Sequence, residues 1–444
     1  MKINIIGAGF AGVEAAFFLA NKGFNINLFE MRDKKMTPAH KTSFFAELVC
    51  SNSFKSTSLE NAHGLLKREL QELNSIVLKI AYNNRVPAGN ALAVDRVKFS
   101  SEITKILKKN KNINFINHEI GSLDKFINNN EITIIASGPL TSNSLQKSIT
   151  KLVGNQSLYF FDAASPIIDG DTIDYNKVFF QSRYNKGGND YLNSALNKEQ
   201  YEILIKEIIN SKKVKFHDFE NKKVYEGCIP IEVLAERGMK TLSFGPMKPV
   251  GIIDPKTDKQ PYAVLQMRQE NINKTMYSIV GFQTRIKWHE QKRIFRMIPG
   301  LEKANFLRYG VIHKNTFLNY PEIIEKTTYS IKKHPNIYFA GQITGIEGYI
   351  ESAASGIINA YSIYAKINGK DIFFPDNTMI GALQKYTITD NKNYQPIGSN
   401  FGLLNKDILY DENNKILKGN LKKIKLAENA ISNIKKFINK NKIL

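Results

Sequence analysis

Apolar positions near the start of the chain follow two different periods, separated by glycines. Residues 3–6 are a short β-prone run of three isoleucines and one asparagine, and residues 13–19 have the apolar pattern of a buried helix. Residues 25–29 form a second β-prone run that ends at Glu30. This order predicts a strand, a glycine turn, a helix and a second strand at the beginning of the chain.

The turn between the first strand and the helix has the spacing Gly-x-Gly-x-x-Gly over residues 7–12. The first glycine allows the tight turn, the second lets the backbone approach a pyrophosphate, and the third lets the helix pack closely on the strand. The helix N-terminus then presents unpaired N–H groups to the phosphates. Glu30 follows at roughly the 20-residue distance typical of a carboxylate that binds a ribose. The segment predicts a dinucleotide site made of these residues: Gly7, Ala8, Gly9, Gly12, Glu30 and Arg32. A helix that needs small residues only for packing is the less favoured interpretation.

Two later segments continue the same pattern. Residues 131–139 and 337–342 each read as a buried strand that runs into a glycine turn, and the second leads to a small-residue helix around 352–357. Strands of this kind complete a Rossmann-like α/β sheet, beside which the pyrophosphate and ring of a flavin would lie. We therefore expect FAD as the dinucleotide, with four further contact residues: Gly138, Gly341, Gln342 and Gly348.

Between these strands the pattern changes to short β-prone runs with many prolines, glycines and aromatic residues. We interpret residues 159–333 as an inserted mixed α+β domain, which divides the FAD-binding domain into residues 1–158 and 334–444. The second part closes with an amphipathic helix over 421–444, whose lysines are either solvated or face RNA.

The composition of the chain narrows the range of possible function classes. The 444 residues include 62 Lys and Arg against 41 Asp and Glu, a formal net charge of +21, which attracts polyanions such as nucleic acid. Drift in an AT-rich genome, which enriches Lys, Asn and Ile, is the alternative origin of this charge. No stretch reaches the roughly 18 apolar residues of a membrane span. Two cysteines are too few for a disulfide framework or a zinc cluster, and no histidines pair at metal-ligand spacing. We expect a cytoplasmic protein without a metal, and the sequence leaves the oligomeric state open.

The two cysteines have different surroundings. Cys228 precedes Pro230, which suits the first turn of a helix that Gly238 terminates. At or just before a helix N-terminus, the dipole favours the reactive thiolate, so this thiol is the stronger candidate nucleophile. Cys50 stands where an apolar run gives way to polar residues, and this pattern alone is more typical of a core cysteine than of a catalytic one.

Taken together, the motifs resemble one family, the folate- and FAD-dependent uracil-C5 RNA methyltransferases. The matching stretches run in order along almost the whole chain and include GAGFAGVEAA (7–16), FAELVCSNSF (45–54), YEGCIPIEVLAERG (225–238), VGFQTRIKWHEQKRIFRMIPGLE (280–302) and YFAGQITGIEGYIESAASG (338–356). The resemblance implies that 5,10-methylenetetrahydrofolate donates a one-carbon unit, which passes through reduced flavin to uracil C5, and that NADH or NADPH supplies the electrons. This chemistry needs a thiolate that adds to uracil C6 and a base that removes the C5 proton. The family's two cysteine positions correspond to Cys228, expected as the nucleophile, and Cys50, expected as the proton acceptor or as a partner that assists the nucleophile.

The resemblance leaves two RNA targets open. The best known members of the family act on uridine 54 of the tRNA T-loop. Where many relatives carry a third cysteine this chain has Ser194, and where they have His-Arg-Asn it has Lys314 in place of the arginine. The composition resembles that of wall-less bacteria with AT-rich genomes, in which a paralogous branch methylates 23S ribosomal RNA. We therefore favour 23S rRNA slightly over tRNA. Two alternatives stay open: a small-molecule flavin oxidoreductase, and a flavin-containing RNA-binding subunit that acts with a partner protein.

Overall fold

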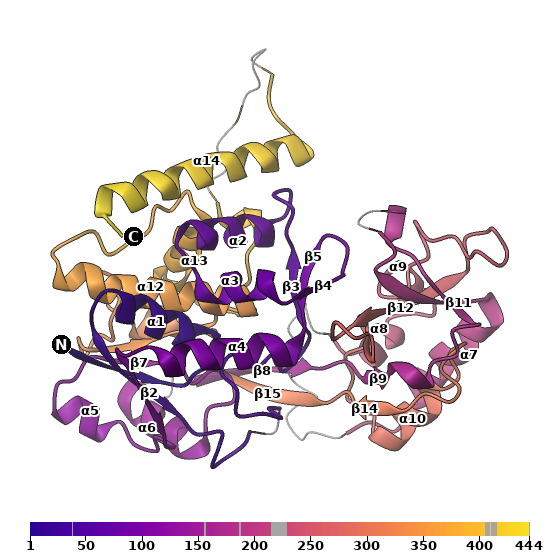
Figure 1. Cartoon of the computed structure of the whole chain (residues 1–444), viewed down its shortest axis with the longest axis horizontal. Coiled ribbons are helices and arrows are strands. Elements are labelled where there is room, and N and C mark those ends of the chain that lie inside the picture. Colours follow the sequence, from indigo (N-terminus) through magenta and orange to yellow (C-terminus); the bar gives the residue numbers. More distant parts are fainter. Residues whose placement is uncertain are drawn as a thin grey trace.

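Among the described residues, the chain builds two large hydrophobic cores and one small apolar cluster of Val86, Ala88 and Ala93 (Figure 1). The computed structural model describes residues 1–37, 39–154, 157–185, 188–214, 229–404, 409 and 415–443. The first core draws its side chains from residues 3–152 and 317–443, and the second draws them from residues 168–306. The exact domain boundaries stay a prediction.

A five-stranded parallel sheet lies at the centre of the first core. Its strands follow the order β16 (Ile337–Phe339), β7 (Thr133–Ile135), β1 (Lys2–Ile6), β2 (Asn25–Glu30) and β6 (Ile113–Asn117), and every neighbouring pair is parallel. Ile6 is in register with Phe29 on one side and with Ile135 on the other. The strands therefore end level with one another, and the loops that follow them gather at one edge, where sheets of this type bind ligands.

All four strands that the sequence predicts in this sheet are present. The two later strands are shorter than the apolar runs from which they were predicted, because the backbone turns before each run ends. β7 ends at Ile135 and is followed by Gly138 at φ +70°, while β16 ends at Phe339 and is followed by Gly341 at φ +84°. The α/β, Rossmann-like fold is thus confirmed.

Helix α1 (Phe10–Asn21) follows β1 and packs tightly against α12 (Tyr349–Ile367). A Cβ atom built on Gly356 would lie 2.2 Å from the carbonyl oxygen of Ala11, so only glycine permits this approach. Both helices point their N-termini toward the edge where the strands end (Figure 1). The other helices of this body are α2 (Ala62–Glu72), α3 (Ile76–Asn83), α4 (Arg96–Lys109), α5 (Asp124–Asn128), α6 (Asn143–Val153), α11 (Tyr320–Ile323) and α13 (Met379–Ile388).

The amphipathic tail helix is also confirmed, as α14 (Gly419–Asn441). It lies against α2 on the outside of the first body (Figure 1). Its buried face consists mainly of Ala427, Ala430, Ile434 and Phe437, at helical spacing.

The second core is built on a six-stranded sheet whose neighbouring strands are all antiparallel. Their order is β10 (Val178–Phe180), β11 (Tyr191–Leu196), β12 (Ala263–Gln269), β13 (Met276–Ile279), β9 (Ile167–Asp169) and β14 (Phe306–Arg308). In the described part of the insertion it is accompanied by the helices α7 (Lys198–Asn210), α8 (Ile231–Glu236), α9 (Thr241–Phe244) and α10 (Trp288–Phe295). The mixture of helices and antiparallel strands agrees with the expected α+β character of the insertion.

Two small sheets link the bodies. The chain leaves the first body along β8 (Ser157–Ala163) and returns along β15 (Ile312–Leu318), and these two strands pair in an antiparallel ribbon. A three-stranded sheet of β3 (Ser53–Ser56), β5 (Ala91–Val94) and β4 (Arg85–Val86) lies on the side of the first body that faces the second (Figure 1). Within the described ranges, no helix combines the length and the apolar character needed to cross a membrane.

Candidate functional site

A cavity of about 990 Å³ opens at the edge where the parallel strands end, and we call it the cofactor cavity. Its walls come from the turn after β1 and from the loops that follow β2, β7 and β16. Most of the predicted cofactor residues line it: Gly7, Gly9, Glu30, Arg32, Gly138, Gly341 and Gln342. The fold therefore brings together residues that lie more than 300 positions apart in the sequence.

The three motif glycines have the geometry that a dinucleotide turn needs. Gly7 has φ +104°, and a Cβ on it would lie 2.5 Å from the carbonyl oxygen of Ala136. A Cβ on Gly12 would lie 1.8 Å from the carbonyl oxygen of Gly7, so the third glycine lets the helix touch the turn. A Cβ on Gly9 would meet nothing within 4 Å, because Gly9 caps α1 at the open side of the cavity. This open backbone is where a phosphate group fits.

Glu30 and Arg32 form a buried charged pair on the wall of the cofactor cavity. The Glu30 carboxylate accepts hydrogen bonds from the backbone N–H of Ala8 (2.9 Å) and Met31 (2.8 Å) and from the Arg32 guanidinium (3.1 Å). Burial acts to raise the pKa of Glu30, but the charge and hydrogen bond of Arg32, together with the backbone hydrogen bonds from Ala8 and Met31, outweigh it and the pKa is lowered. Nη1 of Arg32 is buried without a hydrogen-bond partner and lies 3.8 Å from Oε2 of Glu47. It is a donor available to a ribose or phosphate oxygen.

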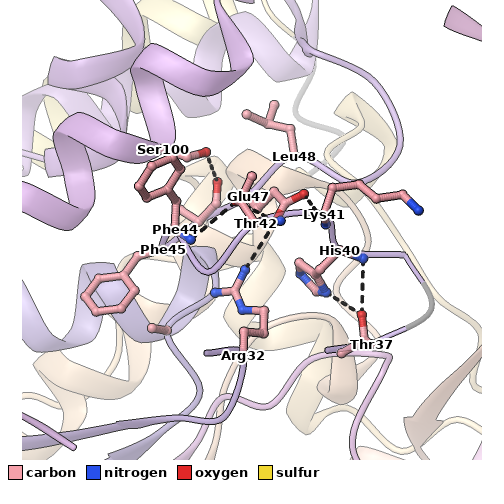
Figure 2. A network of polar contacts seen from close by, with 12 residues as sticks. Arg32, Thr37, His40, Lys41, Thr42, Phe44, Phe45, Glu47, Leu48 and Ser100 are labelled. Atoms are coloured by element: carbon pink, nitrogen blue, oxygen red, sulfur yellow. Dashed lines mark hydrogen bonds and ion pairs between the residues drawn. The ribbon is translucent and has the colours of Figure 1, made fainter. Parts of the chain in front are cut away.

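The loop between β2 and β3 forms a further wall of the cavity, and Figure 2 shows the polar contacts within this loop. Glu47 fixes this loop by accepting hydrogen bonds from the backbone N–H groups of Lys41 (2.8 Å) and Thr42 (3.0 Å). Oγ1 of Thr37 and Nδ1 of His40 lie 2.5 Å apart. The motif spacing did not point to these residues, because their contacts are made within an irregular loop.

A second cavity, of about 1230 Å³, adjoins the first, and we call it the thiol cavity because Cys50 lines it. The residues common to both walls are Val49, Pro139, Leu140, Gln342 and Tyr349. The backbone N–H of Cys50 donates to the hydroxyl oxygen of Tyr349 at 2.7 Å. Cys50 is half-buried, so the core position that its local pattern suggested is wrong and it lies at a cavity wall instead. Gly348 also lines the thiol cavity, and its contact with the cofactor stays a prediction.

Two arginines hold the loop that carries Cys50. Nη1 of Arg96, from α4, donates to the carbonyl oxygen of Leu48, and Nη2 of Arg308, from β14, donates to that of Val49. Burial acts to lower the pKa of Arg96, but the charge of Glu270 outweighs it, with smaller contributions from Tyr349 and Cys50, and the pKa is raised. Arg308 belongs to the second body, so the position of the thiol depends on contact between the two bodies.

The loop is anchored to the second body at a third point. Asn52 is fully buried; its side-chain oxygen accepts a hydrogen bond from Nε of Arg268 (2.9 Å), and its amide donates to the carbonyl oxygen of Gln269 (3.0 Å). The sequence contained one signal for this role, because Arg268 is a charged residue inside a strand that is otherwise suited to burial. Buried charges of this kind need a specific partner.

A further polar group lies in the wall of the thiol cavity. Glu351, at the start of α12, is buried and contacts Nδ1 of His63 at 2.9 Å and Oγ of Ser399 at 2.8 Å. Burial acts to raise its pKa, but His63, Lys55 and Ser399 lower it to about 2, so the group is a carboxylate at neutral pH. Lys67, behind His63, is also buried, and burial lowers its pKa to about 8.

Cys228 lies outside the described residues. The predicted helix beyond it is present as α8, with Pro230 at its N-cap and Gly238 shortly after its end. The backbone N–H of Ile231 donates to the carbonyl oxygen of Gln283 at 2.7 Å, and Gln283 lines the thiol cavity. The described chain therefore resumes beside the cavity that holds Cys50.

Comparison with known proteins places this geometry in a family. Residues 2–371 match the family described as Glucose inhibited division protein A. The chain is 51% identical, over 440 residues and 99% of both chains, to "Methylenetetrahydrofolate--tRNA-(uracil-5-)-methyltransferase TrmFO" of Acetivibrio thermocellus. It is 48% identical to the protein of the same name from Ligilactobacillus salivarius, over 442 residues and again 99% of both chains.

The solved structures support the fold. The chain is similar to GidA of Aquifex aeolicus in its form II crystal, with a TM-score of 0.71 and 16% sequence identity, over 100% of this chain and 74% of that one. The form I crystal of the same protein gives a TM-score of 0.70 at 15% identity, over 100% of this chain and 76% of that one.

Proposed function

The chain belongs to the family of folate- and FAD-dependent uracil-C5 RNA methyltransferases, and from this premise we propose that it forms 5-methyluridine in tRNA. The observation that carries the proposal is the shared wall between the two cavities, since it sets Cys50 beside the space that fits a flavin. The choice of tRNA rests on the names of the relatives. The 23S rRNA target stays a prediction, and the test below includes it.

The residues of the cofactor cavity fit FAD. The open backbone at Gly9 accepts a phosphate at the N-terminus of α1, and the Glu30–Arg32 pair lies where a ribose is bound, with Nη1 of Arg32 lacking a hydrogen-bond partner. These residues would hold FAD, which, once reduced by NADH or NADPH, would supply the carrier for the one-carbon unit of methylenetetrahydrofolate.

The protein's own task is to activate the uracil. Carbon C5 of uracil is a weak nucleophile, and addition of a thiolate at C6 turns the base into an enolate that reacts at C5. We assign this addition to Cys228. We assign removal of the C5 proton to Cys50, which is half-buried and fixed by Tyr349, Arg96 and Arg308. As this proton leaves, the bond between sulfur and C6 breaks, the Cys228 thiolate is released and the C5–C6 double bond is restored. A uridine within a folded RNA must be flipped out of its stack to enter the cavity.

Transfer of labelled carbon tests the proposal. The holoenzyme is incubated with labelled methylenetetrahydrofolate, NADH and either a tRNA transcript or a 23S rRNA transcript. Label in the uracil of tRNA is the expected result, and label in ribosomal RNA alone would replace the substrate. NADH oxidation with no label in either RNA would favour the oxidoreductase alternative. Activity that appears only after addition of a second polypeptide would favour the subunit alternative.

The roles of the two cysteines need a separate test. RNA that contains 5-fluorouridine retains its covalent bond to the nucleophile, because fluorine at C5 cannot leave as a proton does. We expect the adduct, detected by mass spectrometry, to form with Cys50→Ala and to be absent with Cys228→Ala. An adduct that survives in Cys228→Ala and disappears in Cys50→Ala would reverse the two assignments.

A further inference from the structure

Three aromatic rings form a continuous stack that runs from the second core to the surface. Phe306 is buried in the core and stacks on Tyr309, with ring centroids 5.4 Å apart and an interplanar angle of 16°. Tyr309 stacks in turn on Trp288, at 5.6 Å and 12°. Trp288 is 60% exposed. The stack therefore ends in an exposed indole ring, although tryptophan side chains are highly buried on average.

The end of the stack is held rigidly. Trp288 is the first residue of α10, and Gln291 on the same helix is fully buried. The Gln291 amide donates to the carbonyl oxygen of Gly310 at 2.8 Å, and its oxygen accepts from the Gly310 N–H at 2.8 Å. Because Gly310 follows Tyr309 directly, these bonds fix the two stacked residues relative to each other. An exposed aromatic surface that is already ordered binds a partner at a low entropic cost.

The surroundings of the indole are positively charged. Lys212, Lys287 and Lys292 are exposed, and none of them has a carboxylate within ion-pair distance among the described residues. The backbone N–H of Lys287 donates to the carbonyl oxygen of Lys212, so these two lysines lie side by side. Two acidic groups of this region, Glu207 and Glu290, are partly compensated, because Arg293 pairs with Glu207 at 2.6 Å and with Glu290 at 2.9 Å.

The stack also lies close to the thiol cavity. A Cβ on Gly310 would be 2.9 Å from the carbonyl oxygen of Ala164, and the N–H of Ala164 donates to the carbonyl oxygen of Val311. Ala164 is part of the cavity wall. The residue next to Tyr309 thus packs on the wall of the space that we assign to the uracil.

We propose that Trp288 and Tyr309 form a platform on which an unpaired base of the RNA substrate stacks, beside the flipped uridine, while the neighbouring lysines bind its backbone. The inference rests on the proposed RNA substrate and goes beyond it by assigning a binding site in the insertion. Aromatic platforms with positive rims bind single-stranded RNA in this way, since every base offers a face for stacking. The platform holds the substrate by a base that does not react.

Fluorescence tests the platform directly, because Trp288 is the only tryptophan in the chain. The holoenzyme is titrated with single-stranded oligouridine, and binding is followed in parallel by the anisotropy of a labelled oligonucleotide. We expect saturable quenching of the tryptophan emission that follows the anisotropy curve and weakens as salt is added. Binding by anisotropy with unchanged emission would overturn the proposal. Quenching that depends on protein concentration without RNA would indicate a second copy of the chain on this surface, and would also overturn it.

Substitution of Trp288 tests whether the platform contributes to binding of the RNA substrate. Trp288→Ala should weaken binding of the tRNA transcript by roughly 5- to 100-fold and raise its KM, whereas Trp288→Phe should retain most of the affinity. FAD content and NADH oxidation should remain at the wild-type level in both variants, which shows that they fold. Phe244→Ala is the matched control, since Phe244 is 77% exposed on α9, and it should bind RNA normally.

The outcomes separate this inference from the proposed function. Wild-type affinity and KM in Trp288→Ala would overturn the platform even if the enzyme methylates RNA. The wild-type enzyme could instead transfer no label to RNA but show salt-dependent quenching, while Trp288→Ala loses RNA binding in the anisotropy assay. This result would refute the methyltransferase function and leave the RNA platform standing.

Discussion

The cofactor cavity and the thiol cavity share a wall but are built in different ways. The cofactor cavity depends on backbone turns, and its central motif lies within residues 7–12. The thiol cavity depends on side chains that reach across long stretches of sequence: Arg96 contacts Leu48 over 48 positions, and Arg308 contacts Val49 over 259. The first can form as soon as the parallel sheet folds. The second forms only when both bodies are folded and in contact.

The largest expected effect is that of a single methyl group in the glycine turn. Gly12→Ala places a Cβ 1.8 Å from the carbonyl oxygen of Gly7 and 3.0 Å from its carbonyl carbon; both of these Gly7 atoms belong to the backbone, so the helix must move away from the turn. We expect a loss of bound FAD and a destabilisation of about 3 kcal/mol, the upper range for overpacking. Flavin absorbance of the purified protein and its thermal unfolding measure the two effects.

Gly9→Ala is the matched variant in the same turn. Gly9 has φ −75° and its added Cβ would meet nothing within 4 Å, so the apoprotein should unfold at the wild-type temperature. The methyl group nevertheless points into the space assigned to the phosphates, and FAD should bind more weakly. Equal unfolding temperatures for the Gly12→Ala and Gly9→Ala apoproteins would show that the packing argument is wrong.

The next largest effect is expected for the thiol cavity, whose contacts join residues far apart in the sequence. Arg308→Met removes the donor to the carbonyl oxygen of Val49 and frees one end of the Cys50 loop. A hydrogen bond from a charged group contributes about 1.5–3 kcal/mol, so methyl transfer should slow by roughly 10- to 100-fold while FAD content stays unchanged. Steady-state kinetics measure the rate of methyl transfer, and flavin absorbance measures the FAD content.

Arg296→Met serves as the control for this variant, because Arg296 also belongs to the second body and donates to a backbone carbonyl oxygen, that of Ala304 (2.8 and 2.9 Å), which lies outside the Cys50 loop. It should leave turnover unchanged. If Arg308→Met lost its FAD together with its activity, the two halves of the site would not be separable and the comparison between them would fail.

This difference explains how much of the site the sequence predicted. The glycine turn was predictable because each glycine performs a local task, and Gly7, Gly9 and Gly12 occupy positions that suit those tasks. Four of the five strands of the sheet were predictable from short β-prone runs, although Asn4 and Asn27 interrupt two of them. The fifth strand, β6, was not predicted from the sequence. The family membership that the motifs suggested is confirmed by relatives that match over almost the whole chain.

The position of Cys50 was not predictable from its neighbours. An apolar run before a cysteine indicates burial, but here Arg96 and Arg308 hold the run by its carbonyl oxygens and turn the thiol toward a cavity. No local pattern encodes the approach of a residue from another core. The same applies to the ring stack, because Trp288 and Tyr309 meet only where α10 packs against the loop that follows β14.

The titration of Lys67, behind the thiol cavity, is expected to have a smaller effect, which is on the free energy of unfolding. Lys67 is buried and donates to the carbonyl oxygens of Ser56 (2.9 Å) and His63 (3.1 Å), and burial lowers its pKa from 10.5 to about 8. As the pH rises, the folded protein releases this proton near pH 8, whereas the unfolded chain retains it up to about 10.5. The free energy of unfolding should therefore increase with pH across this window, by about 2 kcal/mol between pH 8 and pH 9.5.

Lys67→Met lacks the titrating group and should show no such rise. Chemical denaturation of both proteins at pH 7, 8, 9 and 9.5 measures the difference between their unfolding free energies. Parallel pH profiles for the two proteins would mean that Lys67 is not held in a desolvated position, and that this wall of the thiol cavity is open to water.

The smallest effect distinguishes the insertion from the tail helix as the surface that binds RNA. Lys287→Ala and Lys292→Ala each remove one exposed positive charge beside Trp288, and Lys436→Ala removes one from the exposed face of α14. A lysine that contacts a phosphate contributes about one unit to the slope of log affinity against log salt, and its loss weakens binding only a few-fold. We expect the two insertion variants to lower this slope and Lys436→Ala to leave it unchanged. The opposite result would place the RNA backbone on α14, and the exposed ring stack would then lack the electrostatic support from which its role was inferred.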